Sequence, residues 1–340
     1  MALTIRPITN QTRWNNFVTS CPVQTFLHSW QWGQVQQQMG EPVQYLGIFS
    51  HDQLIGAALV ITVQARRGWH YLIPHGPLAA DDATIYRIIP ALIHHLQHQV
   101  PHRIAAIRIA PLLVSSPVTD DFFPRHSFIS APLHVHAELT LVLDINHSDE
   151  ALLAGMRKTT RQSIRKAQAQ NVTTSIVTND SALSNFWQLY QQTKQRHHFI
   201  PWSYDMLAAQ LKTFSSTNSV FTITAQHQNR TVAAAILIHF GSTVYYYHGA
   251  SVKLPSSIPA SQLIQWRAIQ AARARQATLY NFWGIAPDDQ PHHPFSGITT
   301  FKKGFGGRSI NYAHAQDLPL NWRYWPLWSV EKYRQLKKGF

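Results

Sequence analysis

The chain has 340 residues, which is enough for two domains that each bury a core of their own. Hydrophobic residues make up 45% of it and no low-complexity tract interrupts it, which excludes disordered and fibrous classes of protein. A formal charge of +13, from 29 Lys and Arg against 16 Asp and Glu, favours anionic partners such as polyphosphates, nucleic acid or a membrane surface.

The cysteine and hydropathy patterns bear on where the protein works. Cys21 is the single cysteine, so no internal disulfide can form and the cytosol is the expected compartment. The N-terminal segment MALTIRPITNQTRW lacks the apolar core of a signal peptide, and no run of about 18 apolar residues predicts a membrane span. The paired histidines at 94–95, 197–198 and 292–293 have no Cys or carboxylate at ligand spacing, so we predict no metal site.

Two halves of the chain contain similar segments in the same order. The first half has HDQLIGAALVI (51–61), a helical stretch and a strand ending at Ala110-Pro111; the second has HQNRTVAAAILI (227–238), a helical stretch and a strand ending at Ala286-Pro287. These landmarks are 176 residues apart, and the pairs His75-Gly76 and His248-Gly249 lie between them at an offset of 173. We interpret the halves as two copies of one α/β unit, in the element order of a GNAT-like acyltransferase domain.

A basic helix is predicted where the two halves join. Ser148 is a suitable N-cap, and Asp149 and Glu150 follow it in the first turn. Basic residues then recur at helical spacing, namely Arg157, Lys158, Arg161, Arg165 and Lys166. No acidic residue lies four positions away to neutralise them. The alternatives are a solvated face and a face that binds a polyanion.

Three segments resemble a known family. They are FLHSWQWGQVQ (26–36), RKTTRQSIRKAQAQNV (157–172) and YNFWGIAPDDQPHHPFSGITTFKKGFGG (280–307). In order, and over essentially the whole chain, they resemble the FemABX peptidyltransferases, most specifically in the block FWGI…HP…G…FK-x-GFGG. The resemblance implies two tandem GNAT-like domains with mixed sheets flanked by helices, residues 1–145 with 317–340 and residues 146–316. The chain resembles the short form of the family, without a coiled-coil arm.

The resemblance also implies an activity. These enzymes transfer an amino acid from aminoacyl-tRNA to the side-chain amine of the stem peptide of a peptidoglycan precursor, UDP-MurNAc-pentapeptide or lipid II. No cofactor is implied, because the aminoacyl ester is already activated. The expected protein is a cytoplasmic monomer, and peripheral contact with the inner face of the membrane stays open. Trp322, Trp325 and Trp328, interleaved with basic residues, fit either a membrane interface or packing on the first domain, and we favour packing.

The family pattern assigns the site residues. The functional lysine falls on Lys302, preceded by Phe301, and would stabilise the oxyanion or the leaving ribose oxygen. The expected tRNA contacts are Arg157, Lys158, Arg161, Arg165, Lys303 and Phe305, beside glycines that would let the backbone approach the tRNA end. The expected acceptor contacts are Arg196, Tyr204, Tyr246 and His248 in the second domain, and Trp32, Gly33 and His75 in the first.

This chain departs from the family pattern at four positions. Gln34 and Gln36 stand where a lysine is common, His75 where an arginine is common, and Ala110 where an acidic residue is common. The resemblance therefore does not imply which residues bind the precursor diphosphate, and it does not imply a carboxylate general base. Two other functions stay open: a CoA-dependent N-acyltransferase, whose Q/R-x-x-G-x-G/A loop neither half contains, and a non-catalytic RNA-binding protein, which the charge alone would support.

Overall fold

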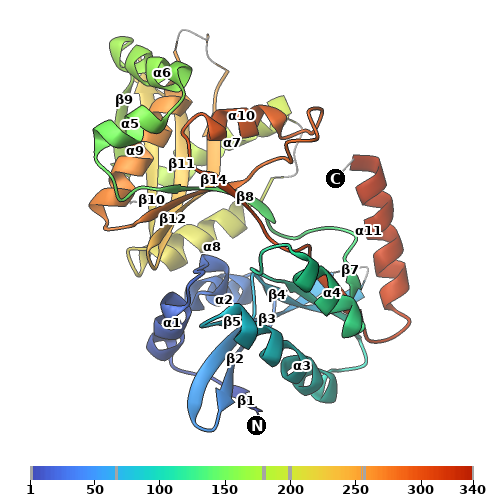
Figure 1. Cartoon of the computed structure of the whole chain (residues 1–340). Coiled ribbons are helices and arrows are strands. Elements are labelled where there is room, and N and C mark those ends of the chain that lie inside the picture. Colours follow the sequence, from blue (N-terminus) through green and yellow to red (C-terminus); the bar gives the residue numbers. More distant parts are fainter. Residues whose placement is uncertain are drawn as a thin grey trace. The chain divides into compact units, whose positions relative to one another are not determined.

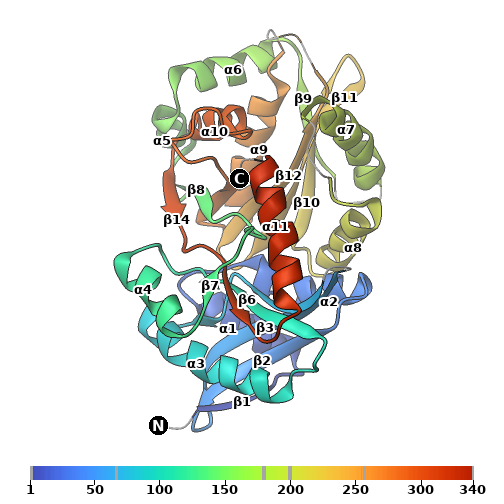
Figure 2. The ribbon, with the colours of Figure 1, turned by 90° about the vertical axis from the view of Figure 1, so that its right-hand side faces the viewer.

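The computed structural model describes residues 3–65, 68–177, 181–197, 201–253, 255 and 258–338. Contacts divide the chain into two compact units, Met1–Leu139 with Ile310–Phe340, and Thr140–Ser309. Each unit contains a mixed β-sheet with helices packed around it (Figure 1; Figure 2).

The first unit has the strand order β1-β2-β3-β4-β6-β15-β7, with β5 paired to β3. Its strands are β1 (Leu3–Pro7), β2 (Val43–Ser50), β3 (Gln53–Ala65), β4 (Gly68–Pro74), β5 (Leu78–Ala79), β6 (Ile104–Ala110), β7 (Ile129–Ser130) and β15 (Gln316–Pro319). Its helices are α1 (Gln11–Ser20), the 3-10 turn η1 (Phe26–His28), α2 (Trp30–Gln38), α3 (Asp82–Gln99), α4 (Pro117–Arg125) and α11 (Tyr324–Lys338).

The second unit has the strand order β14-β8-β13-β12-β11-β10-β9. Its strands are β8 (Leu139–Asp144), β9 (Thr173–Val177), β10 (Val220–His227), β11 (Arg230–Phe240), β12 (Thr243–Ser251), β13 (Leu279–Gly284) and β14 (Arg308–Asn311). Its helices are α5 (Asp149–Gly155), α6 (Lys158–Ala169), α7 (Ser181–His197), α8 (Tyr204–Ser215), α9 (Ala260–Ala274) and α10 (Ser296–Lys303).

The two sheets share one topology. In each unit an outer strand comes first, and two helices follow it. An antiparallel hairpin and a further antiparallel strand come next. A helix then leads to another strand, which runs parallel to the strand before that helix. The hairpins β2–β3 and β10–β11 interrupt their ladders at corresponding places, between Ile48 and Phe49 and between Ala225 and Gln226. Segments 51–61 and 227–238 therefore occupy equivalent places, as the repeat predicts.

The histidine landmarks of the repeat are not equivalent, which corrects the predicted register. His51 lies in the hairpin turn with φ of 54°, whereas His227 ends β10 and Gln228, with φ of 51°, takes the place of His51. The structural offset of this hairpin is thus 177 residues. His75 likewise follows the end of β4, whereas His248 lies inside β12. The histidines of each pair occupy different places because the elements of the two units differ slightly in length.

The core of the first unit lies between its sheet and α3. Asp81 caps α3 by accepting a hydrogen bond from the amide of Thr84 at 2.6 Å. Its buried residues recur at helical spacing, namely Ile85, Ile88, Ile89, Leu92, Ile93 and Leu96, and they pack on apolar residues of β2, β3 and β6. Burial of this stripe, at roughly 25 cal/mol per Å² of apolar surface, attaches the helix to the sheet.

The basic helix predicted after Ser148 is two helices. Ser148 caps α5 as predicted, because its Oγ accepts a hydrogen bond from the amide of Ala151 at 3.2 Å. Helix α5 ends at Gly155, however, and α6 begins at Lys158. The guanidinium of Arg161 donates hydrogen bonds to carbonyls at the end of α5, those of Leu153, Ala154 and Met156. Helix ends leave such carbonyls unpaired, so Arg161 stabilises the break.

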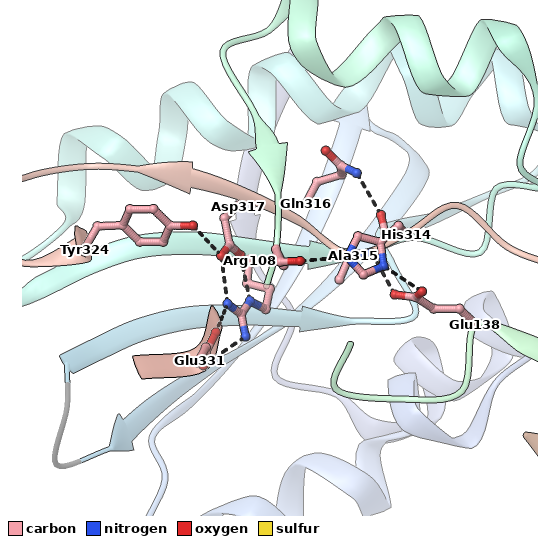
Figure 3. A network of polar contacts seen from close by, with 9 residues as sticks. Arg108, Glu138, His314, Ala315, Gln316, Asp317, Tyr324 and Glu331 are labelled. Carbon is pink, nitrogen blue, oxygen red and sulfur yellow. Dashed lines mark hydrogen bonds and ion pairs between the residues drawn. The ribbon is translucent and has the colours of Figure 1, made fainter. Parts of the chain in front are cut away.

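The C-terminal segment contributes a strand and a helix to the first unit. Strand β15 pairs with β6 and places Asp317 opposite Arg108. The Arg108 guanidinium donates to both carboxylate oxygens of Asp317, at 2.6 and 2.7 Å, and to Glu331 of α11 at 2.7 Å (Figure 3). The Tyr324 hydroxyl donates to Asp317 at 2.8 Å. This buried network ties α11 to the sheet.

Candidate functional site

Lys302 lies in the last turn of α10 with its side chain buried in the second unit. Thr299 and Lys302, one helical turn apart, form the buried face of this short helix. The Lys302 ammonium donates a hydrogen bond to the carbonyl of Gly284 at 2.5 Å and lies 6.0 Å from the ring centroid of Tyr246. Within the described part of the chain, no carboxylate forms an ion pair with it.

The electrostatic consequence is a lysine that titrates near neutral pH. Burial lowers the pKa of Lys302 from 10.5 to about 7, because the charged form loses hydration without gaining an anionic partner. Both the ammonium and the amine are therefore populated at pH 7. Such a group can supply positive charge to a reacting oxygen, or give and take a proton.

The carbonyl that accepts from Lys302 lies at an irregular end of β13. The ladder with β8 shifts between Asn281 and Gly284, and Trp283 between them has φ of 65°. A bulky residue with positive φ is rare, and such strain concentrates at functional sites. The Trp283 amide donates to Asn281 Oδ1 at 2.7 Å, and the Ala286 amide donates to Thr299 Oγ1 at 2.7 Å. The first bond stabilises the irregular end of β13, and the second holds Ala286 against α10.

The aromatic ring of Tyr246 lies near the Lys302 ammonium. Burial raises its pKa to about 12, against the opposing effect of a hydrogen bond with Gln265, so the hydroxyl is neutral at pH 7. Tyr280 also donates to Gln265 Oε1, at 2.8 Å. Tyr246 is half-buried. Gln265 and Thr299 carried no motif signal, and their roles appear only in three dimensions.

The glycines that follow Lys302 approach the protein's own chain. A Cβ on Gly304 would lie 2.5 Å from Thr160 Oγ1, and a Cβ on Gly307, whose φ is 92°, would lie 2.3 Å from the carbonyl oxygen of Val142. Phe305 is only 1% exposed and packs on Phe282 at 5.6 Å between ring centroids. The expectation that Phe305 stacks on a tRNA base is therefore wrong for this conformation, because its ring belongs to the core.

Two neighbours of Lys302 are more accessible. Phe301 is half-buried and meets Phe305 edge to face at 5.5 Å. Lys303 forms an ion pair with the exposed Asp288. In solvent such a pair contributes at most about 1 kcal/mol, so Lys303 can exchange this partner for an anionic ligand.

The basic face around α6 is smaller than the sequence predicts. Arg161 is half-buried and bound to the carbonyls of α5, so its role is structural. Arg157, Lys158, Arg165 and Lys166 are exposed. These four side chains, with Lys303, remain as candidate contacts for a polyanion.

The predicted acceptor residues of the second unit are dispersed. His248 is buried and hydrogen-bonded through Nε2 to Gln210 at 2.9 Å, and burial lowers its pKa to about 3, so it is a neutral core residue. Arg196 donates to the backbone and hydroxyl of Ser251, at 2.9 and 3.1 Å. Both residues therefore support β12, the strand that carries Tyr246. Tyr204 is 44% exposed and lines a separate cavity of about 510 Å³ beside α8.

The predicted acceptor residues of the first unit are core residues. Trp32 is 2% exposed, and a Cβ on Gly33 would lie 2.1 Å from the Tyr45 hydroxyl. His75 is buried, with Nδ1 3.2 Å from Thr25 Oγ1, and its pKa lies well below 6.5 because of burial and then of His136 and His28. We correct these three assignments, because none of these side chains presents a polar group at the surface of its unit.

Metal and membrane features can be stated for the described chain. Its His, Cys, Asp and Glu side chains form no group of three or more that could hold a metal ion. His198, of the pair at 197–198, lies outside the described residues. None of the helices that the structure covers is both long and apolar enough to cross a bilayer.

Comparison with known proteins connects this geometry to a family. The model of the FemAB family matches residues 9–124, 129–225 and 204–325. The aminoacyltransferase FemA of Staphylococcus epidermidis is 29% identical over 122 residues, which is 36% of this chain and 28% of the length of that relative.

Solved structures share the fold over nearly the full chain. A crystal structure of FemX has a TM-score of 0.82 at 16% identity and covers 97% of this chain and 99% of its own. A tandem GNAT protein from the clavulanic acid biosynthesis pathway has a TM-score of 0.58 at 10% identity and covers 94% of this chain and 99% of its own. These likenesses confirm the predicted fold of two tandem GNAT-like domains.

Proposed function

Because this chain belongs to the FemAB family, we propose that it transfers an amino acid from aminoacyl-tRNA to the side-chain amine of a peptidoglycan precursor's stem peptide. The observation that carries the proposal is the environment of Lys302, a buried lysine in the family's FK-x-GFG pattern whose ammonium meets a carbonyl and an aromatic ring. A cation held without a carboxylate is suited to an oxygen that becomes negative during a reaction.

The transfer is the aminolysis of an ester. The acceptor amine attacks the aminoacyl carbonyl, a C–N bond forms, and a tetrahedral oxyanion results. The C–O bond to the tRNA ribose then breaks, and the proton lost by the amine passes to the leaving ribose oxygen. In this scheme the Lys302 ammonium stabilises the oxyanion or donates the proton to the leaving oxygen, and its pKa near 7 suits either task.

The remaining roles follow from exposure and charge. For the donor, we assign the tRNA backbone to Arg157, Lys158, Arg165, Lys166 and Lys303, which are accessible basic groups of the second unit. For the acceptor, UDP-MurNAc-pentapeptide or lipid II, we assign contacts to Tyr246 and Tyr204. Arg196 and His248 act on β12 and so position Tyr246. We propose a monomer that works in the cytoplasm.

The test of this activity is product formation. Purified protein is incubated with a panel of charged tRNAs and with UDP-MurNAc-pentapeptide or lipid II, and the branched product is detected by mass spectrometry. Lys302→Met should lower the turnover rate by roughly 100-fold, about 3 kcal/mol in the barrier. Lys303→Met is the matched control and should act mainly on KM for the tRNA.

Four outcomes would count against the proposal. Product from no combination of substrates, or full turnover by Lys302→Met, would contradict aminoacyl transfer by this site. Acylation of an amine from acetyl-CoA would favour the CoA-dependent alternative. Tight tRNA binding without any transfer would favour the RNA-binding alternative.

The donor surface has its own test. Arg165→Gln with Lys166→Gln should weaken tRNA binding and reduce the slope of log K against log salt by about 1 to 2, because each phosphate contact releases counterions. Arg161→Gln is the control: it should leave the slope unchanged and lower the thermal stability, since Arg161 binds α5 carbonyls. An unchanged slope in the double variant would show a merely solvated face.

A further inference from the structure

The outer side of α11 exposes large apolar side chains that the core of the first unit does not use. Trp322, just before the helix, is 70% exposed, and Trp325, Tyr333 and Leu336 are 53%, 65% and 74% exposed. Isolated exposed residues are ordinary, but four large ones on one short segment form a patch. We refer to these four residues as the aromatic face.

Helical spacing separates the aromatic face from the face that packs on the sheet. Tyr324, Leu327 and Glu331, at i, i+3 and i+7, point inward: the first two are buried and Glu331 binds Arg108. Trp325, Tyr333 and Leu336 lie eight and eleven residues apart, within about a quarter turn of one another, on the outer side. The predicted packing of the tryptophans on the first domain is thus wrong for Trp322 and Trp325.

Basic residues lie along the segment, and Lys332 and Lys337 are on the same side of the helix as the aromatic face, whereas Arg334 is not. Arg323, Arg334 and Lys337 are exposed, and Lys332 is half-buried. The acidic residue of the helix is Glu331, whose carboxylate is already bound to Arg108. The outer side therefore combines an apolar centre and a cationic border, the composition of a helix that lies in a membrane interface.

A cavity adjoins the aromatic face. It has a volume of about 550 Å³, and its lining includes Trp69, Arg103, Trp322 and Arg323. The Arg103 guanidinium lies 3.9 Å from the Trp69 ring centroid. Two arginines and two indoles around an open cavity suit a phosphate with an apolar neighbour, as in a phospholipid headgroup.

We propose that the aromatic face and its basic border dock this protein on an anionic phospholipid bilayer. Charge complementarity selects this occupant, because a second copy of the same cationic face would be repelled. RNA would satisfy the charge but not the aliphatic Leu336 at the far end of the face. Docking would keep the enzyme at the surface where a lipid-linked acceptor resides, but it does not depend on the transfer activity.

The test is binding to vesicles without any substrate. The full chain is sedimented with phosphatidylcholine vesicles and with vesicles of equal parts phosphatidylcholine and phosphatidylglycerol, and we expect binding to the second kind only. Trp322→Ser with Trp325→Ser should weaken that binding by roughly tenfold or more. Lys332→Gln with Lys337→Gln should weaken it by roughly 25-fold, because each basic group near an anionic surface contributes about fivefold.

The controls keep the proposal falsifiable. Trp202→Ser removes an exposed tryptophan of the second unit and should leave vesicle binding unchanged. The charge variant touches no packed aromatic ring, so it reports on docking even if the tryptophan variant folds poorly. Equal binding to both vesicle types would overturn the proposal, and so would the absence of binding. The proposal would also fail if the variants lost affinity for tRNA but kept their affinity for vesicles. If vesicle docking failed in these ways, the proposed transfer to soluble UDP-MurNAc-pentapeptide could still be correct, because it does not require a membrane.

Discussion

Arg108 in the first unit and Lys302 in the second are both buried cations, and the protein stabilises them in opposite ways. Arg108 stands two residues before the Ala-Pro pair of β6. The same place in the repeat is Gly284, whose carbonyl accepts from Lys302. Burial alone would lower the pKa of Arg108, but its bonds and charge interactions with Asp317 and Glu331 raise it. Among the described residues no carboxylate compensates Lys302 in this way, and burial lowers its pKa to about 7.

The presence or absence of carboxylate partners distinguishes a structural cation, Arg108, from the cation that we propose to be reactive, Lys302. Asp317 and Glu331 accept hydrogen bonds from Arg108, and Tyr324 donates to Asp317, so the charge of Arg108 holds the C-terminal segment in place. The charge of Lys302 is held at a cost in stability, and we propose that it acts on a substrate. The buried cation of the first unit thus attaches α11 to the sheet, and we propose that the buried cation of the second unit acts in catalysis.

The largest expected effect comes from buried histidines, of which the described part of the first unit has several and that of the second has His248. Burial lowers the pKa of His28 and His70 to about 4 and that of His136 to about 3. Unfolded histidines bind protons near pH 6.5, so the stabilisation is complete above pH 6.5 and is lost as the pH falls toward 4. Each histidine contributes up to about 1.4 kcal/mol per pH unit in this window.

Urea unfolding followed at pH 7 and pH 5 measures this loss, and the first unit should lose stability at pH 5 by several kcal/mol. His314 opposes the trend, because its hydrogen bond and charge interaction with Glu138 outweigh burial and raise its pKa. Substitution of the exposed His98 by Gln should leave the acid sensitivity intact. Equal midpoints at the two pH values would contradict the assignment of neutral buried histidines.

The next effect breaks the comparison at Arg108. Arg108→Met leaves the carboxylates of Asp317 and Glu331 without their cation, and we expect the free energy of unfolding to fall by about 3–5 kcal/mol. Arg334→Met, an exposed arginine on the same C-terminal segment, should change it by less than about 0.5 kcal/mol. Denaturant titration compares the two variants. A small effect at Arg108 would show that the network in Figure 3 contributes little to stability.

The smallest effect has the opposite sign and sharpens the comparison at Lys302. Lys302→Met should raise the free energy of unfolding at pH 7 by on the order of 2 kcal/mol, because a poorly solvated amine is replaced by an apolar side chain. The folded-state pKa is below that of the unfolded lysine, so the stability of the parent should rise between pH 7 and pH 10. That rise should be absent in Lys302→Met and present in Lys303→Met.

An NMR titration of the lysine side chains gives a direct check. One Cε resonance should titrate near pH 7 in the parent and be missing from Lys302→Met. If every observed lysine titrates near 10, the lowered pKa is wrong, and the stability difference between the variants should vanish with it.

Local patterns determined many of the elements and the choice of Lys302 as the candidate functional lysine. Ser148 followed by acidic residues predicted the start of α5, and the Ala-Pro pairs and hairpin segments predicted a repeated α/β unit. These features depend on neighbours in the chain, on side-chain periodicity and on turn chemistry, which a sequence displays directly. The motif FK-x-GFG likewise distinguished Lys302 from Lys303 before their burial was known.

Only the tertiary structure decided which of the named polar and aromatic groups are free to act. Arg161 and His248 are bound to α5 carbonyls and to Gln210, and Phe305 and His75 are in the cores of their units. Partners from distant segments set burial and hydrogen bonding, and the sequence does not show those partners. The same reason applies to Lys302: its motif singles it out, but its pKa near 7 comes from its burial beside Gly284 of β13 and Tyr246 of β12.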